Sequence, residues 1–256
     1  MKIFVFTKTK LLSFLFCLTL AVITVIIATQ GVSTAINVNS NKNRQIPIYC
    51  VDKKEKVISI SFDAAWGNEQ TTELLNILDK YNVKTTFFVV GDWVDKYPES
   101  VKEIHEHGHD VCNHSNTHPY MTKLSKDDMK NQIQSCNDKI SAITGISPLL
   151  FRPPYGDYDN TVVETTREMG MYCIQWDVDS LDWKDPTPEQ IKERVCSKIK
   201  EGSIVLFHNG AKNTPSALPL CIESIQSQGY QIVPISTLIY QGNYETDHEG
   251  RQKAIN

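Results

Sequence analysis

The run Val57-Ile58-Ser59-Ile60-Ser61-Phe62-Asp63 decides how the rest of the chain can fold. Its β-branched and apolar residues favour a buried strand. A helical pattern follows, with apolar residues at 74, 75, 77 and 78 on one face. Further strands are expected at residues 85–90, 109–113, 149–151, 171–178, 203–207 and 231–233, with helical patterns between most of them. Strands that alternate with helices predict a parallel α/β sheet, either closed into a barrel or open and doubly wound.

Several helix boundaries carry clear signals. A proline, or a serine or threonine that can accept a hydrogen bond from the backbone, favours a helix start. A glycine favours the end, because it readily adopts a positive φ. These signals predict helices from Pro98 to Gly108, from Ser125 to Gly145 and from Thr187 to Gly202.

Polar side chains stand where the expected strands end. The carboxyl ends of parallel strands meet at one edge of a sheet or one mouth of a barrel, and catalytic groups gather there. We therefore expect these residues to line one cleft: Asp63, His114, Arg152, Asp179 and His208.

The stretch His114-Ser-Asn-Thr-His118 places two imidazoles four residues apart. They share one face of a helix or one mouth of a tight loop, and could supply two ligands to a divalent metal. An isolated pair of this spacing also occurs as surface or capping histidines. Three further histidines, His105, His107 and His109, flank a helix end, and we interpret them as solvent-facing or as charge partners of that end.

Composition limits the classes of function. The 256 residues are enough for one enzyme-sized domain and a targeting segment, and the apolar share of 41% is typical of a globular protein. A net charge of −4 argues against nucleic acid as a partner. Of seven cysteines, Cys17 lies in an apolar run. The other six could form three disulfides, but they lack close pairing in sequence and we favour buried thiols.

The amino-terminal segment resembles an export signal. Three lysines in residues 1–10 precede an apolar run over 11–28. Residues 1–35 are therefore a signal peptide or a membrane anchor, and the body of the protein is expected outside the cytoplasmic membrane, anchored or secreted. We divide the rest into a polar linker (36–56), the α/β domain (57–240) and a flexible tail (241–256).

Five short segments resemble the ordered motifs of a known family. They are Ser-Phe-Asp63, His114-Ser-Asn-Thr-His118, Arg152-Pro-Pro-Tyr155-Gly156, Asp179-Ser-Leu-Asp182-Trp183 and Leu206-Phe-His208. The order and spacing are similar to those of the polysaccharide deacetylases, also called NodB-homology or carbohydrate esterase family four enzymes. The resemblance spans roughly residues 55 to 240. It implies a distorted (β/α)7 barrel and metal-dependent hydrolysis of the N-acetyl amide of sugars.

The resemblance also implies roles for the catalytic residues. Asp63 resembles the general base, and Arg152 the residue that holds its carboxylate in place. His208 resembles the general acid that protonates the leaving amine. Asp179 is expected to pair with His208 and to raise its pKa. We interpret Asp182 as structural.

Binding residues follow in the same way. His114 and His118 resemble metal ligands, with zinc expected and cobalt an alternative. The backbone N–H of Tyr155 would donate to the oxyanion of the intermediate. Trp183 would form a wall beside the acetyl group or support the general acid.

One departure from the family motif leaves the function open. The family normally has a second, metal-binding acid after the base, whereas this chain has Ala64. Asp63 itself, Asn68 or Glu69 could take that place, or the site binds metal poorly. The variant Phe-Asp-Ala-Ala-Trp-Gly resembles a sporulation-associated branch, which suggests N-acetylglucosamine or N-acetylmuramic acid of peptidoglycan as substrate.

We therefore predict a monomeric deacetylase of cell-wall glycan, in contact with the membrane through its amino-terminal segment. The alternative is a glycan-binding protein on the same fold that has lost efficient catalysis. A related amidohydrolase of a small acylated amine is a third possibility.

Overall fold

The computed structural model describes residues 19, 22 and 44–255. Apart from Thr19 and Val22, the predicted signal or anchor lies outside the described residues. Within the described part, no helix is both long and apolar enough to cross a membrane. The described residues from 45 to 255 form one compact unit.

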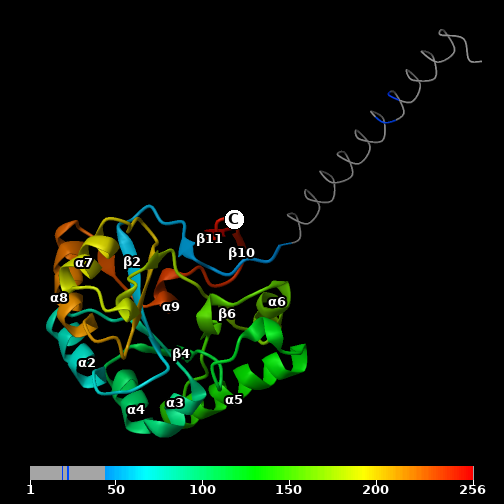
Figure 1. Ribbon diagram of the computed structural model, residues 1–256, viewed down its shortest axis with the longest axis horizontal. Helices are drawn as coiled ribbons and strands as arrows, with labels where there is room; N and C mark the ends of the chain where they lie inside the picture. Colours follow the sequence, from blue (N-terminus) through cyan, green and yellow to red (C-terminus); the bar gives the residue numbers. More distant parts are fainter. Residues whose placement is uncertain (1–18, 20–21, 23–43, 256) are drawn as a thin grey trace, which may run out of the picture. The chain divides into compact units, whose positions relative to one another are not determined.

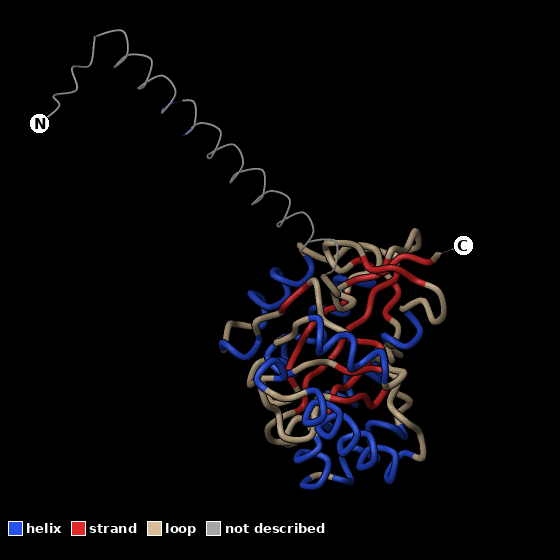
Figure 2. The backbone as a smooth tube through the Cα atoms, turned by 90° about the vertical axis from the view of Figure 1, so that its right-hand side faces the viewer, coloured by secondary structure: helices blue, strands red, loops and turns tan. Residues whose placement is uncertain are grey.

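A curled parallel sheet forms the centre of this unit, with helices packed around its outside (Figures 1 and 2). Its strands are β2 (Val57–Ala64), β3 (Thr86–Val89), β4 (Asp110–Asn113), β5 (Leu150–Phe151), β6 (Tyr172–Cys173), β7 (Val178–Asp179) and β8 (Ile204–His208). They run in the order β6-β5-β4-β3-β2-β8-β7, and β9 (Gln231–Ile232) pairs with the start of β2. The sheet is a distorted, incomplete α/β barrel, as predicted.

Helices follow most of the strands. They are α2 (Thr71–Lys80), α3 (Gly91–Lys96), α4 (Pro98–Glu106), α5 (Lys126–Thr144), α6 (Asn160–Glu168), α7 (Pro188–Cys196), α8 (Thr214–Ser227) and α9 (Ile235–Leu238). The Ser125 side chain caps α5 by accepting from the Asp128 N–H, and Gly145 ends it with φ of +72°. The helix α7 ends before the predicted Gly202. That glycine has φ of +79°, and a Cβ there would overlap the carbonyl oxygen of Val51.

The strand β2 separates the two sides of the sheet. Its polar residues Ser59, Ser61 and Asp63 alternate with apolar residues that join a buried cluster with α2 and α8. Each large apolar side chain buried in that cluster contributes about 1.5–3 kcal/mol. Because the side-chain period of a strand is two, this burial fixes the register and turns Asp63 toward the barrel interior.

The predicted strand over 171–178 is wrong as a single element. It forms two short strands, β6 and β7, at opposite edges of the sheet. The residues between them bond elsewhere: the Gln175 N–H donates to the Ile48 carbonyl at 2.7 Å. The Asp177 carboxylate accepts from the Ile204 N–H and the Ser203 hydroxyl, both at 2.9 Å. These bonds carry the chain across the gap in the barrel.

The predicted flexible tail and part of the predicted linker are also wrong. The strands β1 (Cys50–Val51), β10 (Tyr244–Thr246) and β11 (Arg251–Ala254) form a small sheet that joins the two ends of the unit. Gln252 stabilises it: its fully buried amide exchanges two hydrogen bonds of 2.8 Å with the Tyr240 backbone. The polar composition of the tail gave no indication of this pairing. A polar side chain such as Gln252 can be buried at little cost in free energy when both ends of its amide are hydrogen-bonded.

The cysteines of the described part are free thiols, as favoured from the sequence. Five are buried and one, Cys196, is half-buried. They are Cys50, Cys112, Cys136, Cys173, Cys196 and Cys221.

Candidate active site

A pocket of about 380 Å³ opens at the carboxyl ends of the strands. It contains seven of the eight predicted site residues, and the eighth, Arg152, lies fully buried beneath it. Its lining residues are Asp63, Ala65, Trp66, His114, His118, Tyr155, Trp176, Asp179, Trp183, Leu206 and His208. Of the five strand-end residues expected to line one cleft, four line this pocket and Arg152 does not.

The loops around this pocket hold unusual backbone conformations. Among the described residues, six that are not glycine have positive φ, and five of them lie in three loops beside the pocket. Such a conformation costs an L-residue roughly 1–2 kcal/mol and is concentrated at functional sites. The five are Ser115 (67°), His118 (59°), Tyr155 (60°), Leu181 (54°) and Asp185 (54°).

Asp63 is held by a buried ion pair. Arg152 follows β5 and is 0% exposed; its Nη1 donates to Asp63 Oδ1 at 2.7 Å. Its Nη2 donates to the Ser61 hydroxyl at 2.9 Å and to the Gln175 carbonyl at 3.1 Å. The guanidinium lies 4.0 Å from the ring centroid of Phe88. Arg152 is therefore fixed, and it orients the Asp63 carboxylate.

This environment keeps Asp63 ionised. Burial alone would raise the pKa of the Asp63 carboxyl, but the charges of Arg152, His114 and His208 outweigh it, and the net pKa is lowered. The second oxygen, Oδ2, lies 3.4 Å from Nε2 of His114, which also lines the pocket. Asp63 thus presents a charged acceptor to the pocket.

His208 is paired with Asp182, so the predicted pairing with Asp179 is wrong. His208 Nδ1 lies 2.7 Å from Asp182 Oδ1, and the His208 backbone N–H donates to Asp182 Oδ2 at 2.8 Å. The Thr214 hydroxyl donates to the same Oδ2 at 2.6 Å. Asp179 instead accepts from the Leu181 N–H at 2.8 Å. The positive φ of Leu181 starts the turn that brings the fully buried Asp182 back to the end of β8.

Asp182 changes the acidity of His208. Burial alone would lower the pKa of His208, but the hydrogen bond and charge of Asp182, with further help from Asp63 and Asp179, outweigh it. The net pKa of His208 is raised, which favours the imidazolium. Because Nδ1 is hydrogen-bonded to Asp182, the proton that His208 can donate to the pocket is the one on Nε2. No sequence signal distinguishes Asp182 from Asp179, since both acids follow the same strand.

His114 and His118 match part of a metal site. His114 Nδ1 lies 2.7 Å from the Arg152 carbonyl, so Nδ1 carries the proton and Nε2 keeps its lone pair. The two ring centroids are 4.9 Å apart. Burial lowers the pKa of both rings, that of His118 to about 4, and neutral imidazoles bind metals. Among the described residues, however, no three His, Cys, Asp or Glu side chains converge as a ligand set. Two donors fit, and the third of a usual catalytic zinc site is missing.

Residues 64 and 65 are the two positions that could carry the metal-binding acid of the family motif. The family resemblance places it at Ala64, which is 1% exposed and packs in the apolar cluster outside the sheet. Ala65, the next residue, lines the pocket. The strand β2 ends at Ala64, so Ala65 is the first residue beyond it, and Ala65 also packs against that cluster. Asn68 donates to the Ser100 hydroxyl at 2.9 Å, and neither Asn68 nor Glu69 is among the residues that line the pocket.

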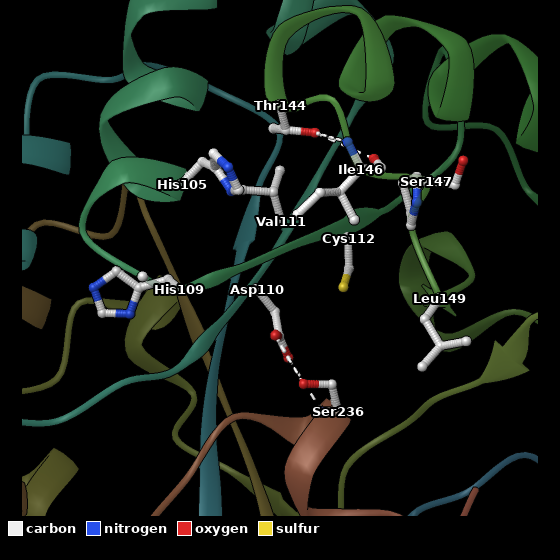
Figure 3. Close-up of a pocket in the computed structure, with 12 residues that line it drawn as sticks. His105, His109, Asp110, Val111, Cys112, Thr144, Ile146, Ser147, Leu149 and Ser236 are labelled. Atoms are coloured by element: carbon white, nitrogen blue, oxygen red, sulfur yellow. Dashed lines mark hydrogen bonds between the residues drawn. The ribbon is translucent and has the colours of Figure 1, made fainter.

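A second cavity, of about 300 Å³, lies at the amino-terminal ends of β4 and β5 (Figure 3). It also contains an acid and two histidines, and Asp110 and Nδ1 of His109 are hydrogen-bonded to other residues of the fold. Asp110 Oδ1 accepts from the Ser236 hydroxyl at 2.8 Å, and Oδ2 from the Thr86 hydroxyl at 2.9 Å and the Ser236 N–H at 3.1 Å. His109 Nδ1 accepts from the Thr85 N–H at 3.0 Å.

His109 is 4% exposed, so its prediction as a solvent-facing residue is wrong. Its ring packs edge-on against Phe87, with centroids 5.5 Å apart. His107 Nδ1 lies 2.6 Å from Asp79 Oδ2, so its partner is a carboxylate of α2 and not the helix end.

The pocket at the carboxyl ends defines the class of protein. A carboxylate and an imidazole face one cavity, each fixed by a buried partner, which is an arrangement suited to hydrolysis with a general base and a general acid. The sequence profile of the polysaccharide deacetylase family matches residues 51–174. A peptidoglycan-N-acetylglucosamine deacetylase from Bacillus cereus is 34% identical over 194 residues, 74% of this chain and 91% of that protein. The chain belongs to the polysaccharide deacetylase family, whose members hydrolyse N-acetyl amide bonds.

Two further relatives are a deacetylase and a pseudoenzyme. PdaC of Bacillus subtilis, a peptidoglycan-N-acetylmuramic acid deacetylase, is 37% identical over 73% of this chain and 40% of its own length. The crystal structure of BA3943 from Bacillus anthracis, described as a CE4 family pseudoenzyme, matches with a TM-score of 0.73 and 38% identity, over 75% of this chain and 68% of that one. A BA3943 mutant is described as having restored enzymatic activity. The chain spans 60%, 40% and 39% of the length of three curated relatives.

Proposed function

We propose that the protein removes N-acetyl groups from N-acetylglucosamine or N-acetylmuramic acid residues of peptidoglycan. One observation carries the proposal. Asp63 and His208 are partners in register on the adjacent strands β2 and β8, and both line the same pocket. Each is held by its own buried partner, Arg152 or Asp182. A glycan-binding site alone does not need a poised base and a poised acid.

The residues suggest a sequence of proton transfers. Asp63 accepts a proton from a water molecule that attacks the acetyl carbonyl carbon. The Tyr155 N–H is proposed to donate to the oxyanion, a type of contact worth about 2.7–4 kcal/mol. His208 then donates its Nε2 proton to the sugar nitrogen as the C–N bond breaks. Asp182 stabilises the imidazolium before this step, and Arg152 keeps Asp63 ionised.

His114 and His118 are proposed to hold a divalent metal, zinc or alternatively cobalt. When bound, the metal would polarise the carbonyl and acidify water. Two imidazoles bind less tightly than the usual three ligands, so we propose a weakly loaded site that depends on the metal concentration.

Acetate release tests the proposal. The full-length protein, in mild detergent, is incubated with peptidoglycan and with N-acetylglucosamine oligomers, with added zinc, cobalt or chelator. Release that depends on metal and is lost in His114→Ala supports a metal-dependent deacetylase. Absence of release from every glycan at saturating metal contradicts the proposal.

A second candidate is a glycan-binding protein with little catalysis. Two observations favour it: no third acid joins the two histidines among the described residues, and a pseudoenzyme shares the fold at 38% identity. Tight glycan binding without acetate release would identify this function.

The setting of the activity is part of the same proposal. Peptidoglycan lies outside the cytoplasmic membrane, so the lysine-rich, apolar start of the chain is proposed to export or anchor the domain. The Phe-Asp-Ala-Ala-Trp-Gly variant supports a role in sporulation. We propose a monomer, and sizing of the purified protein by light scattering tests this.

A further inference from the structure

Exposed aromatic side chains gather at a single place in the described part of the chain. Only four aromatic residues there are classed as exposed: Trp66 (62%), Tyr120 (53%), Tyr155 (56%) and Trp183 (54%). Three of them line the pocket. The fourth, Tyr120, stacks on Tyr155 with ring centroids 4.3 Å apart and an interplanar angle of 18°. A cluster of exposed apolar rings at one cavity marks a binding surface.

Four of the rings near this mouth form a continuous row. Trp66 lies edge-on to His118 at 5.9 Å, and His118 lies edge-on to Tyr155 at 4.5 Å. Tyr155 then stacks on Tyr120. We call these four residues the aromatic row. It starts in the pocket and ends at Tyr120, which is not among the residues that line the pocket.

The row is held in position by strained backbone. His118 and Tyr155 both have positive φ, of 59° and 60°. A positive φ is uncommon for residues other than glycine, and it persists here because the surrounding structure requires it. The Thr122 N–H and hydroxyl, two residues after Tyr120, are fixed by Asp157 at 2.8–3.0 Å. This contact ties the loop of Tyr120 to the loop of Tyr155.

We infer that Tyr120, stacked on Tyr155, binds the pyranose ring next to the sugar whose N-acetyl group enters the pocket. This inference rests on the proposed function and identifies its substrate as a sugar within a chain. Pyranose rings present faces of C–H groups that pack on aromatic rings, while their hydroxyls stay in water. The pocket, at about 380 Å³, takes one N-acetyl sugar, and the row continues beyond it. A net charge of −4 disfavours a nucleic acid as the stacked ligand.

Comparing oligosaccharides of different length tests the inference. Affinities for N-acetylglucosamine and its tetramer are measured by calorimetry on the full-length protein in detergent, in an Asp63→Asn background that prevents turnover. We expect Tyr120→Ala to weaken tetramer binding by about tenfold, or 1.4 kcal/mol, and to change monosaccharide binding by less than about twofold. Tyr120→Phe, which keeps the stacked ring, should retain the tetramer affinity.

Three outcomes overturn the inference: an equal loss for monosaccharide and tetramer, no loss for either, or no binding of the tetramer to the parent protein. Circular dichroism of each variant checks that it is folded. Because binding is measured without turnover, absent acetate release contradicts the deacetylase alone, whereas an unchanged tetramer affinity in Tyr120→Ala contradicts the subsite alone.

Discussion

The two cavities at opposite ends of the strands contain similar residues and differ in how those residues are bonded. At the amino-terminal ends, both oxygens of Asp110 accept hydrogen bonds from Thr86 and Ser236. At the carboxyl ends, Arg152 donates only to Oδ1 of Asp63, and Oδ2 lies 3.4 Å from the pocket residue His114. An acid with both oxygens bonded stabilises the fold, whereas an acid with one oxygen fixed and one available can accept a proton.

Substitution of the two acids should separate these roles most strongly. We expect Asp63→Asn to lower the rate of acetate release by about 10²–10⁴-fold, the usual contribution of a general base. Asp110→Asn is the matched control in the other cavity. It loses hydrogen bonds near Ser236 but touches no pocket residue, so the rate per folded molecule should not change. Equal losses in both variants would show that the two cavities do not differ in function.

The buried ion pair predicts the next largest effect, on stability. Arg152→Met leaves the Asp63 carboxylate without its partner, and loss of one member of a buried pair costs about 3–5 kcal/mol. The matched control is Lys84→Met at the exposed pair of Lys84 and Asp79, where we expect about 0–1 kcal/mol. Urea unfolding measures both. Similar midpoints would mean that Arg152 contributes no more than a surface charge.

The same pair gives a pH dependence of stability. The pKa of Asp63 is lowered in the folded state, so its contribution is present above the unfolded pKa and is lost as the pH falls through the folded pKa. In Arg152→Met, the loss of unfolding free energy that Asp63 causes at low pH should be smaller. Unfolding curves between about pH 5 and pH 2 measure it.

Adding an acid to the pocket should have a smaller effect. Because Ala65 lines the pocket, Ala65→Asp supplies a third donor near His114 and His118, and we expect zinc to bind at least about tenfold more tightly. Ala64→Asp places a charge in the apolar cluster and should lower the unfolding free energy. Zinc titration and urea unfolding of both variants measure this. Tighter zinc binding in Ala64→Asp alone would mean that the end of β2 turns residue 64 inward.

The sequence predicted the parts of the site that depend on local patterns. The alternation in β2 and the strand-end positions of His114, Arg152 and His208 follow from local residue order, and the structure confirms that they converge. The partner of His208 depends on the turn at Leu181, whose positive φ has no residue signature. The pairing of β1 with β11 joins residues about 200 positions apart, and only tertiary contacts determine it.

The smallest predicted effect is a shift in pH dependence, which separates the partner of His208 from its neighbour. In the proposed mechanism His208 acts as the general acid, so activity should be lost as the pH rises through the pKa of His208. Asp182→Asn removes the main cause that raises this pKa, so the alkaline limb of the rate profile should move to lower pH. Asp179→Asn should move it less, because Asp179 acts on His208 only through its charge, and more weakly than Asp182 does. NMR titration of the His208 ring checks the assignment independently of turnover. The pairing of His208 with Asp182 stabilises the fold below the pKa of an unfolded histidine. This contribution is lost as the pH rises through the raised pKa of folded His208, and it should be absent in Asp182→Asn. A larger shift in Asp179→Asn than in Asp182→Asn would restore the pairing that the sequence suggested.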